Sequence, residues 1–360
     1  MTNSQLAIFV LVRAGIGHGA NALPNSTDWE SVRVIAVRQG LLAVAFDGLK
    51  CLSEEGYVQS LPLTEKLCWL GEVMQGYEQR YQLYKKAIAQ LARFYSSQGF
   101  RMMLLKGYAC CINWPKPDHR PCGDIDIYLF GQQKEADARM AQEFKNLKID
   151  NSRHHHSVFN WQGFTVENHY DFMNVHHHKS NVEIEKVFKT IANDDSNVIQ
   201  LEGEKVYLPS PNLHALFLLR HAMAHFAAEQ ITIRHLLDWA FFVKEHTQEV
   251  DWGWLERQLD VFGMTPMYGI INAICVEDLG FEAGMFTQAQ CDSQMKERVL
   301  SEILSPEFSP SLPKRMDHRV VYKYRRWKGN EWKHKLCYND SMRSSLWAGI
   351  WNHLLKPSTI

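Results

Sequence analysis

The sequence changes its pattern twice, and these changes restrict the fold more than any other feature. From residue 29 to about residue 97, apolar residues recur at three- and four-residue intervals, the spacing of amphipathic helices. Between residues 100 and 209, short apolar runs are separated by polar or Gly/Pro segments, which is typical of strands. Helical spacing returns from Pro211. The sequence therefore predicts an α+β protein, a small mixed β-sheet core flanked by N-terminal and C-terminal helical regions.

We expect three parts, covering residues 1–97, 98–209 and 210–360. The strands are expected at residues 101–105, 125–130 and 159–171, where the last run forms a hairpin that turns at residues 161–163. The helices that follow the N-terminal region are expected at residues 108–114, 134–147, 212–228, 231–245, 252–262 and 267–279.

The composition excludes several classes of protein. With 46% hydrophobic and 22% charged residues among 360, the chain is neither disordered nor fibrous, and its net charge of −1 gives no general attraction to nucleic acid or membrane. The apolar run at residues 6–12 is too short to span a bilayer, and no Lys or Arg precedes it, so we expect a first helix and a cytoplasmic protein. The eight cysteines form no CxxC pair, and reduced thiols are expected.

Two aspartates in the predicted core point to a metal site. On a strand, Asp124 and Asp126 lie on one face because successive side chains alternate. Two adjacent carboxylates repel each other unless a cation lies between them, and such hard ligands suit Mg²⁺ or Mn²⁺ bound together with phosphates. A solvent-facing strand edge is the alternative. The expected third ligand is Glu167 on the predicted hairpin, and three such carboxylates are typical of two-metal phosphoryl or nucleotidyl transfer.

The third carboxylate has competitors, because Asp171, Glu183 and Glu185 occur on nearby segments that also resemble strands. Lys106 and Gly107 lie where the first strand would turn into a helix, a place where free N–H groups bind phosphate. The alternative for Lys106 is an ordinary surface or capping lysine.

These residues resemble the uncharacterised nucleotidyltransferase-like proteins of the polymerase-beta superfold. The similar motifs are Leu-Leu-Lys-Gly at residues 104–107, Trp-Pro-Lys-Pro at 114–117, Arg-Pro-Cys-Gly-Asp-Ile-Asp at 120–126 and Glu-Asn-His at 167–169. The resemblance extends to His221, His225, Arg234 and Asp238. It implies a nucleotidyltransferase core in which Asp124, Asp126 and Glu167 are the catalytic and metal-binding triad. The predicted substrate-binding residues are Lys106, Gly107, Arg120, Gly123, His169, His225 and Arg234.

The chain departs from the wider superfold in two ways. Tyr108 follows Gly107 where the superfold has a serine that helps to hold the triphosphate, and the loop at residues 114–121 lengthens the separation from Asp124. Two residues also have alternative roles: Arg120 either contacts a phosphate or closes this Pro-rich loop, and Arg234 either lines the pocket or pairs with its helical neighbour Asp238.

Histidine triplets at residues 154–156 and 176–178 raise the alternative of a zinc site. Adjacent strand residues point to opposite faces, so no triplet can supply three ligands to one tetrahedral ion. We expect solvated strand flanks, and the alternative is that one histidine of each triplet meets the other in the cleft. His221 and His225 share a helix face, which permits a metal site, but their apolar neighbours favour a core-facing stripe.

Residues 310–345 contain ten Lys or Arg against three Asp or Glu, with tyrosines and tryptophans between them. This pattern is found where proteins contact a phosphate backbone and stack on bases. We favour the simpler interpretation, an amphipathic helix docked through its aromatic side chains.

We predict a metal-dependent nucleotidyltransferase that moves a nucleoside monophosphate from a nucleoside triphosphate to a hydroxyl of an unknown acceptor, with Mg²⁺ or Mn²⁺ as cofactor. Asp124 and Asp126 would hold the ion of the nucleotide, and Glu167 would complete the second site. A catalytically silent nucleotide- or anion-binding module is one alternative, supported by the missing serine after Gly107. An RNA-binding protein that uses residues 310–345 is another. Nucleic acid is the less favoured partner, and no membrane partner is expected.

Overall fold

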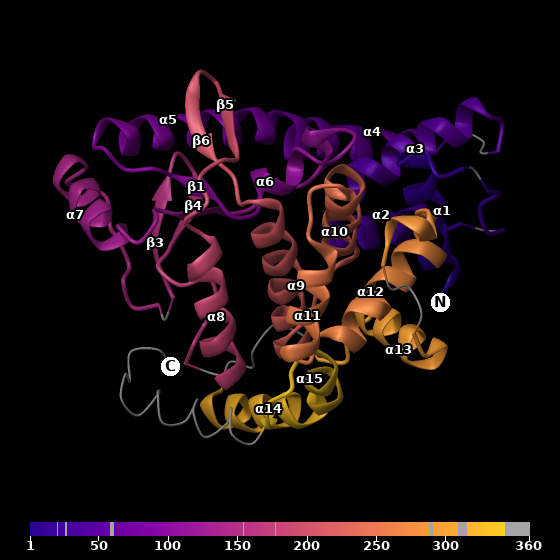
Figure 1. The fold of residues 1–360 in the computed structure, drawn as a ribbon. Coiled ribbons are helices and arrows are strands. Elements are labelled where there is room, and N and C mark those ends of the chain that lie inside the picture. Colours follow the sequence, from indigo (N-terminus) through magenta and orange to yellow (C-terminus); the bar gives the residue numbers. More distant parts are fainter. Residues whose placement is uncertain are drawn as a thin grey trace.

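The structure is a computed structural model, and it describes residues 1–19, 21–25, 27–57, 61–153, 155–176, 178–287, 291–308 and 315–342. The protein is a mixed α+β molecule with one six-stranded sheet flanked by helices, which confirms the predicted fold class (Figure 1). None of the helices in these ranges combines the length and the apolar character needed to cross a bilayer.

The N-terminal region is helical, as its apolar spacing predicted. It comprises α1 (Asn3–Gly15), α2 (Trp29–Gln39), α3 (Leu42–Glu54), α4 (Leu63–Glu72), the π-helical segment η1 (Val73–Gln79) and α5 (Arg80–Ser97). Just after α5, Gly99 adopts a φ of 81°, the left-handed conformation expected where this helix ends. In Figure 1, α5 runs along the top of the molecule, next to the sheet.

Helices α1 and α3 cross through a contact between their backbones. A Cβ atom on Gly15 would clash with the carbonyl oxygen of Val44, and one on Gly48 would clash with that of Leu11. Because neither position has room for a side chain, the two helices approach more closely than other residues would allow. This contact fixes the position of Asp47 on α3.

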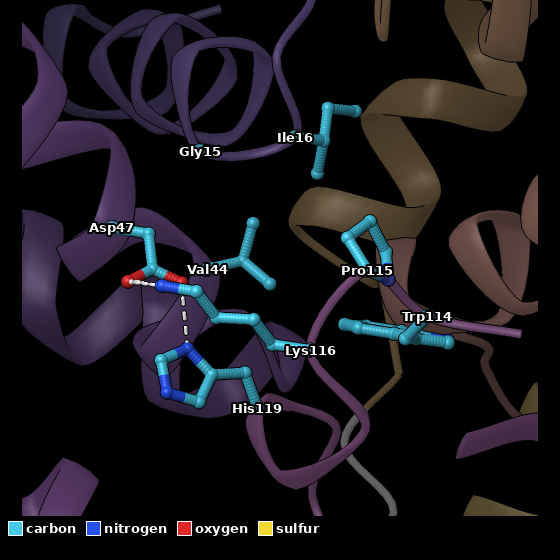
Figure 2. Close-up of a pocket in the computed structure, with 8 residues that line it drawn as sticks. All are labelled: Gly15, Ile16, Val44, Asp47, Trp114, Pro115, Lys116 and His119. Atoms are coloured by element: carbon cyan, nitrogen blue, oxygen red, sulfur yellow. Dashed lines mark hydrogen bonds and ion pairs between the residues drawn. The ribbon is translucent and has the colours of Figure 1, made fainter. Parts of the chain in front are cut away.

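Asp47 holds the Pro-rich loop at residues 114–121, which contains the short 3-10 turn η2 (Pro117–His119). Lys116 Nζ donates to its carboxylate at 2.7 Å, and His119 Nδ1 lies 2.6 Å from it. Dashed lines in Figure 2 join this carboxylate to both side chains. The cavity beside them is about 10 Å³, room for a single water molecule, so it is not a substrate site.

The sheet has the strand order β3-β4-β2-β1-β6-β5. Its strands are β1 (Met103–Leu104), β2 (Ile125–Tyr128), β3 (His156–Trp161), β4 (Phe164–His169), β5 (Val198–Leu201) and β6 (Glu204–Tyr207). The pairs β2 with β4 and β1 with β6 are parallel, and the other pairs are antiparallel. Three helices occur between the strands: α6 (Tyr108–Cys111), α7 (Gln133–Glu143) and α8 (Lys179–Ile191).

The predicted hairpin is confirmed as β3 and β4, although its turn is the two-residue Gln162-Gly163, with φ values of 52° and 82°. A second hairpin, β5–β6, was not predicted from the sequence and turns in the same way, at Glu202-Gly203. The strand-like interpretation of Glu183 and Glu185 is wrong. Both lie on α8, where the carboxylate of Glu185 accepts hydrogen bonds from the backbone N–H groups of residues 172 and 173.

The C-terminal region is helical, as predicted. It comprises α9 (Pro211–Ala228), α10 (Ile233–His246), α11 (Trp252–Val261), α12 (Thr265–Glu277), the 3-10 turn η3 (Ala283–Met285), α13 (Ser293–Leu304), α14 (Met316–Gly329) and α15 (Glu331–Cys337). Figure 1 shows α14 and α15 at the lower edge of the molecule.

Part of the basic segment at residues 310–345 is docked in the way the simpler interpretation expected. Trp332 packs against Phe226 on α9 with ring centroids 5.8 Å apart. The expectation that the charges are solvated is wrong for Lys333, which is only 1% exposed because its Nζ pairs with a carboxylate oxygen of Glu302 at 2.6 Å. Residues 310–314 and 343–345 of the segment lie outside the described residues.

Two apolar cores lie on the two faces of the sheet. Ile125 and Ile127 pack with Tyr84 of α5 in one core, whereas Tyr128 belongs to the larger core of the N- and C-terminal helices. Asp126 therefore faces away from α5 because side chains alternate along β2.

The division of the chain into three parts stays a prediction.

Candidate functional site

Strands β2 and β4 bring acidic side chains together on the face that points away from α5. Their parallel register places Asp126 opposite Glu167. Asp126 is 2% exposed, whereas the Glu167 side chain is 22% exposed, and Asp124 just before β2 is open to solvent. Partial burial and the negative charges of Glu167 and Asp126 raise the pKa of Asp124. The three predicted carboxylates are thus close enough to repel one another.

Asp126 is held by two cationic partners. Lys106 Nζ lies 3.0 Å and His169 Nε2 lies 3.2 Å from its Oδ1. Burial would raise the pKa of Asp126, but these partners outweigh it and the pKa is lowered. Burial opposes the charged form of His169, yet hydrogen bonds to Asp126 and Glu167 raise its pKa. The negative charge of Asp126 is therefore retained inside the protein.

The first histidine triplet contributes to this cluster. His156 lies opposite His169 in the β3–β4 register, is 8% exposed, and its Nε2 is 3.6 Å from a carboxylate oxygen of Glu167. The expectation of a solvated flank is wrong for this residue because β3 turns it toward the acidic cluster. Burial lowers its pKa to about 4. His154 lies outside the described residues.

The cluster contains two overlapping sets of metal-ligand types, each with its ligand atoms within 4.8 Å of one another. One set is Asp126, Glu167 and His169, and the other is His155, His156 and His169. In the described residues, Asp124 belongs to neither set, although it interacts electrostatically with both acids of the first. Converging carboxylates, two of which raise the pKa of Asp124, are a donor set that fits Mg²⁺ or Mn²⁺.

A pocket of about 160 Å³ opens beside the carboxylates. Helices α9 and α10 form part of its wall through residues such as His221 and Arg234, and the segment from Lys106 to Asp126 forms the rest. Seven predicted site residues line it: Lys106, Gly107, Arg120, Gly123, Asp124, Asp126 and Arg234. Of the remaining three, Glu167 and His169 belong to the acidic cluster next to it, and His225 contacts the lining residue His221.

The Lys106-Gly107 turn is locked to the acidic strand. Gly107 has a φ of 63°, and a Cβ atom there would lie 2.5 Å from the hydroxyl of Tyr84. That hydroxyl donates to the carbonyl oxygen of Asp124 at 2.7 Å. Tyr108, which replaces the expected serine, is buried and stacks on Tyr81 with ring centroids 6.1 Å apart. Position 108 is therefore part of the core rather than a phosphate contact.

Arg120 lines the pocket but is occupied by another partner. Its Nε and Nη2 donate to the two carboxylate oxygens of Asp238 at 2.7 and 2.9 Å, and Trp114 Nε1 donates to the same carboxylate at 2.9 Å. Burial would raise the pKa of Asp238, but the charge of Arg120 outweighs it and the pKa is lowered. Arg120 therefore closes the Pro-rich loop against α10, the second of its two predicted roles.

Arg234 has hydrogen-bonding capacity to spare. Its Nη2 donates to His235 Nε2 at 3.2 Å, and its buried Nε has no hydrogen-bond partner among the described residues. Burial and the charge of Arg120 lower the pKa of Arg234. The alternative for Arg234, a helical pair with Asp238, is replaced by the Arg120 pair, which leaves Arg234 available to an anion in the pocket.

Sequence reasoning did not include His221 among the site residues. Lys106 Nζ lies 2.9 Å from its Nε2, and the Nε2 of His225 lies 3.2 Å from the same atom. Burial, together with the charge of Lys106, lowers the pKa of His221 well below its usual value, so a neutral ring accepts from the ammonium group. The i, i+4 spacing of the two histidines was the available signal.

A family model described as an uncharacterised nucleotidyltransferase matches residues 25–280, and the chain belongs to this family. Membership implies a nucleotide substrate, and the matched range contains every predicted site residue. The crystal structure of an antigenic nucleotidyltransferase-like protein from Paracoccidioides brasiliensis is similar at 14% sequence identity with a TM-score of 0.34, covering 49% of this chain and 85% of that one. No curated protein matches the chain.

Proposed function

We propose that the protein transfers a nucleoside monophosphate from a nucleoside triphosphate to a hydroxyl group of an acceptor, with Mg²⁺ or Mn²⁺ as cofactor. The observation that carries this proposal is the convergence of Asp124, Asp126 and Glu167 beside a pocket that also presents Lys106 and Arg234. Carboxylates next to cations are the arrangement that phosphoryl and nucleotidyl transfer requires.

The three carboxylates would hold the divalent cation. When bound, the cation would relieve their mutual repulsion and stabilise the charge that develops on the transferred phosphoryl group. Asp126 is the fixed member of the triad, because it is buried on β2 and held by Lys106 and His169. Asp124 is the open member and faces solvent.

The phosphates would be bound by Lys106 and Arg234, which line the pocket from different elements. The buried Nε of Arg234 has no hydrogen-bond partner in the described part of the chain, and the Lys106 side chain is 23% exposed. Arg120 is left out of this role because Asp238 occupies its guanidinium group. Its contribution is to hold the loop that leads into Asp124.

In the reaction, the acceptor hydroxyl oxygen forms a bond to the α-phosphorus and the bond from this phosphorus to the leaving pyrophosphate breaks. The hydroxyl proton passes to a carboxylate oxygen of Glu167. Glu167 suits this step better than Asp126, because its side chain is 22% exposed and the Asp126 pKa is lowered.

The test uses each nucleoside triphosphate labelled at the α-phosphate, Mg²⁺ or Mn²⁺, and a cell extract as the source of acceptors. We expect label transfer by the wild type and by Asp260→Asn, a solvent-exposed control on α11, and none by Asp124→Asn. Label at the γ-phosphate should not transfer. Equal labelling with all three proteins would end the proposal.

A catalytically silent nucleotide-binding module is the second candidate. It is favoured by the Lys106–Asp126 pair, which neutralises a carboxylate without a metal ion, and by the burial of Tyr108. This candidate predicts that nucleotide binds equally well with and without Mg²⁺ and that no label is transferred to any acceptor. Binding that strengthens with Mg²⁺ in the wild type but not in Asp124→Asn speaks for the enzyme.

A further inference from the structure

Three side chains from distant parts of the chain meet outside the pocket. His178 precedes α8, His334 lies on α15, and Asp340 follows α15 by three residues. One ligand atom of each, a ring nitrogen or a carboxylate oxygen, lies within 4.8 Å of the others. None of the three lines the nucleotide pocket. His178 is the last histidine of the second triplet, and it has no role in the proposed nucleotidyl transfer.

The distances in this cluster suit a metal better than hydrogen bonds. His178 Nδ1 and His334 Nε2 each lie 3.4 Å from Oδ1 of Asp340. Hydrogen bonds between charged groups are shorter, about 2.7–2.9 Å. In a tetrahedral zinc site with bonds of about 2.0–2.1 Å, neighbouring ligand atoms are about 3.3–3.4 Å apart. The two separations from Asp340 match the edges of such a tetrahedron, and the two histidine nitrogens lie within 4.8 Å of each other.

A buried nitrogen at the centre of the cluster lacks a hydrogen bond. Among the described residues, Nε2 of His334 is buried without a hydrogen-bond partner, and the residue is only 5% exposed. Leaving a ring nitrogen unsatisfied inside a protein is costly, so such an atom calls for a ligand. This nitrogen faces Asp340 Oδ1, where a cation would also contact His178.

The surrounding residues hold the three side chains in position. The second oxygen of Asp340, Oδ2, accepts from the backbone N–H and hydroxyl of Ser180 at 3.3 and 3.2 Å. Arg220 in turn donates to the Ser180 hydroxyl at 2.9 Å. Tyr338 stacks on both imidazoles, with ring centroids 4.1 Å from His178 and 4.9 Å from His334. Partners of this kind orient ligands in known metal sites.

We propose that His178, His334 and Asp340 bind one Zn²⁺ ion, with the remaining tetrahedral position open to water. Two imidazoles and one carboxylate favour zinc over Mg²⁺ or Ca²⁺, which prefer oxygen ligands. The ion would fasten α15 and the segment that follows it to the start of α8. It is a stabilising site, separate from the acidic cluster, and two of its ligands lie beyond the range matched by the family model.

The first test measures zinc content after equilibrium dialysis. Because the acidic cluster also offers ligands, it is done in an Asp126→Asn/His169→Gln background as well as in the wild type. In this background we expect about one zinc per chain. It should be lost in His178→Gln and His334→Gln, and retained in His176→Gln, a matched control from the same triplet. Equal zinc in all variants, no zinc in any, or loss in His176→Gln would overturn the proposal.

The second test uses Co²⁺ and thermal unfolding to separate ligand loss from misfolding. Co²⁺ in the Asp126→Asn/His169→Gln background should give the visible absorption of a tetrahedral site, and this absorption should vanish in Asp340→Asn. In EDTA, His178→Gln should melt at the same temperature as its parent, and added Zn²⁺ should raise the melting temperature of the parent alone. If Zn²⁺ raises both equally, the site is elsewhere. Failure here leaves the nucleotidyl transfer proposal untouched, since that is tested by label transfer.

Discussion

Two ion pairs line the same pocket and differ in how completely they are satisfied. Asp238 gives both carboxylate oxygens to Arg120, accepts from Trp114 as well, and is buried with its partner. Asp126 meets Lys106 through one oxygen, and the Lys106 side chain is 23% exposed. The first pair is a closed structural unit, whereas the second can be rearranged around a ligand.

This difference indicates that, in one cavity, the Arg120–Asp238 pair has a structural role and the Lys106–Asp126 pair has a functional one. A bidentate pair that is fully buried fixes geometry, and breaking it leaves an uncompensated charge inside the protein. Asp126 instead lies near two negatively charged side chains, Glu167 and Asp124, so binding of a cation would relieve electrostatic repulsion. Substitutions in the two pairs should therefore affect different measurements.

The largest effect is expected from Asp126→Asn on the rate of label transfer. We expect a loss of about 1,000-fold, equivalent to about 4 kcal/mol of transition-state stabilisation. The free energy of unfolding should fall by only about 1 kcal/mol, because Lys106 can reach water when its partner is removed. Transfer rates are measured beside Asp260→Asn. A rate within about threefold of the wild type would remove Asp126 from the site.

Asp238→Asn should do the reverse. Removing this charge leaves Arg120 buried and unpaired, so the free energy of unfolding in urea should fall by about 3–5 kcal/mol. The control is Lys116→Met, which removes only the exposed partner of Asp47 at the edge of the same loop, where Lys116 is 54% exposed, and we expect about 1 kcal/mol there. If the two variants unfold alike, the closed character of the Arg120 pair is refuted.

Lys106→Met should weaken nucleotide binding. We expect KM for the nucleoside triphosphate to rise about tenfold, about 1.4 kcal/mol, because one charged contact to phosphate is lost. Lys116→Met on the neighbouring loop should leave KM unchanged, since its partner is Asp47 outside the pocket. Steady-state kinetics check both. A fall in kcat without any rise in KM would mean that Lys106 positions Asp126 rather than binding substrate.

Local patterns in the sequence predicted the carboxylate side of the pocket. Alternation along β2 placed Asp124 and Asp126 on one face, and the hairpin pattern placed Glu167 on a neighbouring strand. The β5–β6 hairpin was missed because each of its strands is only four residues long, too short for a clear alternating pattern. Glu185 was misplaced because the apolar spacing of α8 was not recognised.

The wall of the pocket that helices α9 and α10 form could not be predicted in the same way, because it depends on contacts between segments that are far apart in the sequence. Arg120 and Asp238 are 118 positions apart, and His178 and Asp340 are 162 positions apart. Spacing on α10 offered pairing of Asp238 with Arg234 as an alternative, but burial of the Pro-rich loop gives Asp238 a bidentate partner in Arg120. Which charged residues of distant segments pair is decided by how the segments pack. A single sequence shows the possible partners but does not show which of them pair.

The smallest effect concerns how His169 couples to Asp126 as the pH changes. His169 has a raised pKa, so its charged form contributes stability that is fully present below its unfolded pKa of about 6.5 and is lost as the pH rises through the folded pKa. Asp126 has a lowered pKa, so its contribution is present above about pH 4 and is lost as the pH falls. The pair should therefore stabilise the fold most between these limits.

His169→Gln should accordingly cost more stability at about pH 5.5 than at about pH 8.5, by about 1 kcal/mol in the free energy of unfolding. His156, whose pKa is lowered to about 4, acts in the opposite direction, and because the charge of His169 contributes to this lowering, the substitution also changes the His156 contribution and reduces the expected difference. Urea unfolding of wild type and variant at the two pH values measures this. A difference that does not change with pH would show that His169 stays neutral. Among the described residues, Lys106 would then be the one charged partner that compensates Asp126. The Lys106–Asp126 pair would in that case depend even more on a bound ligand.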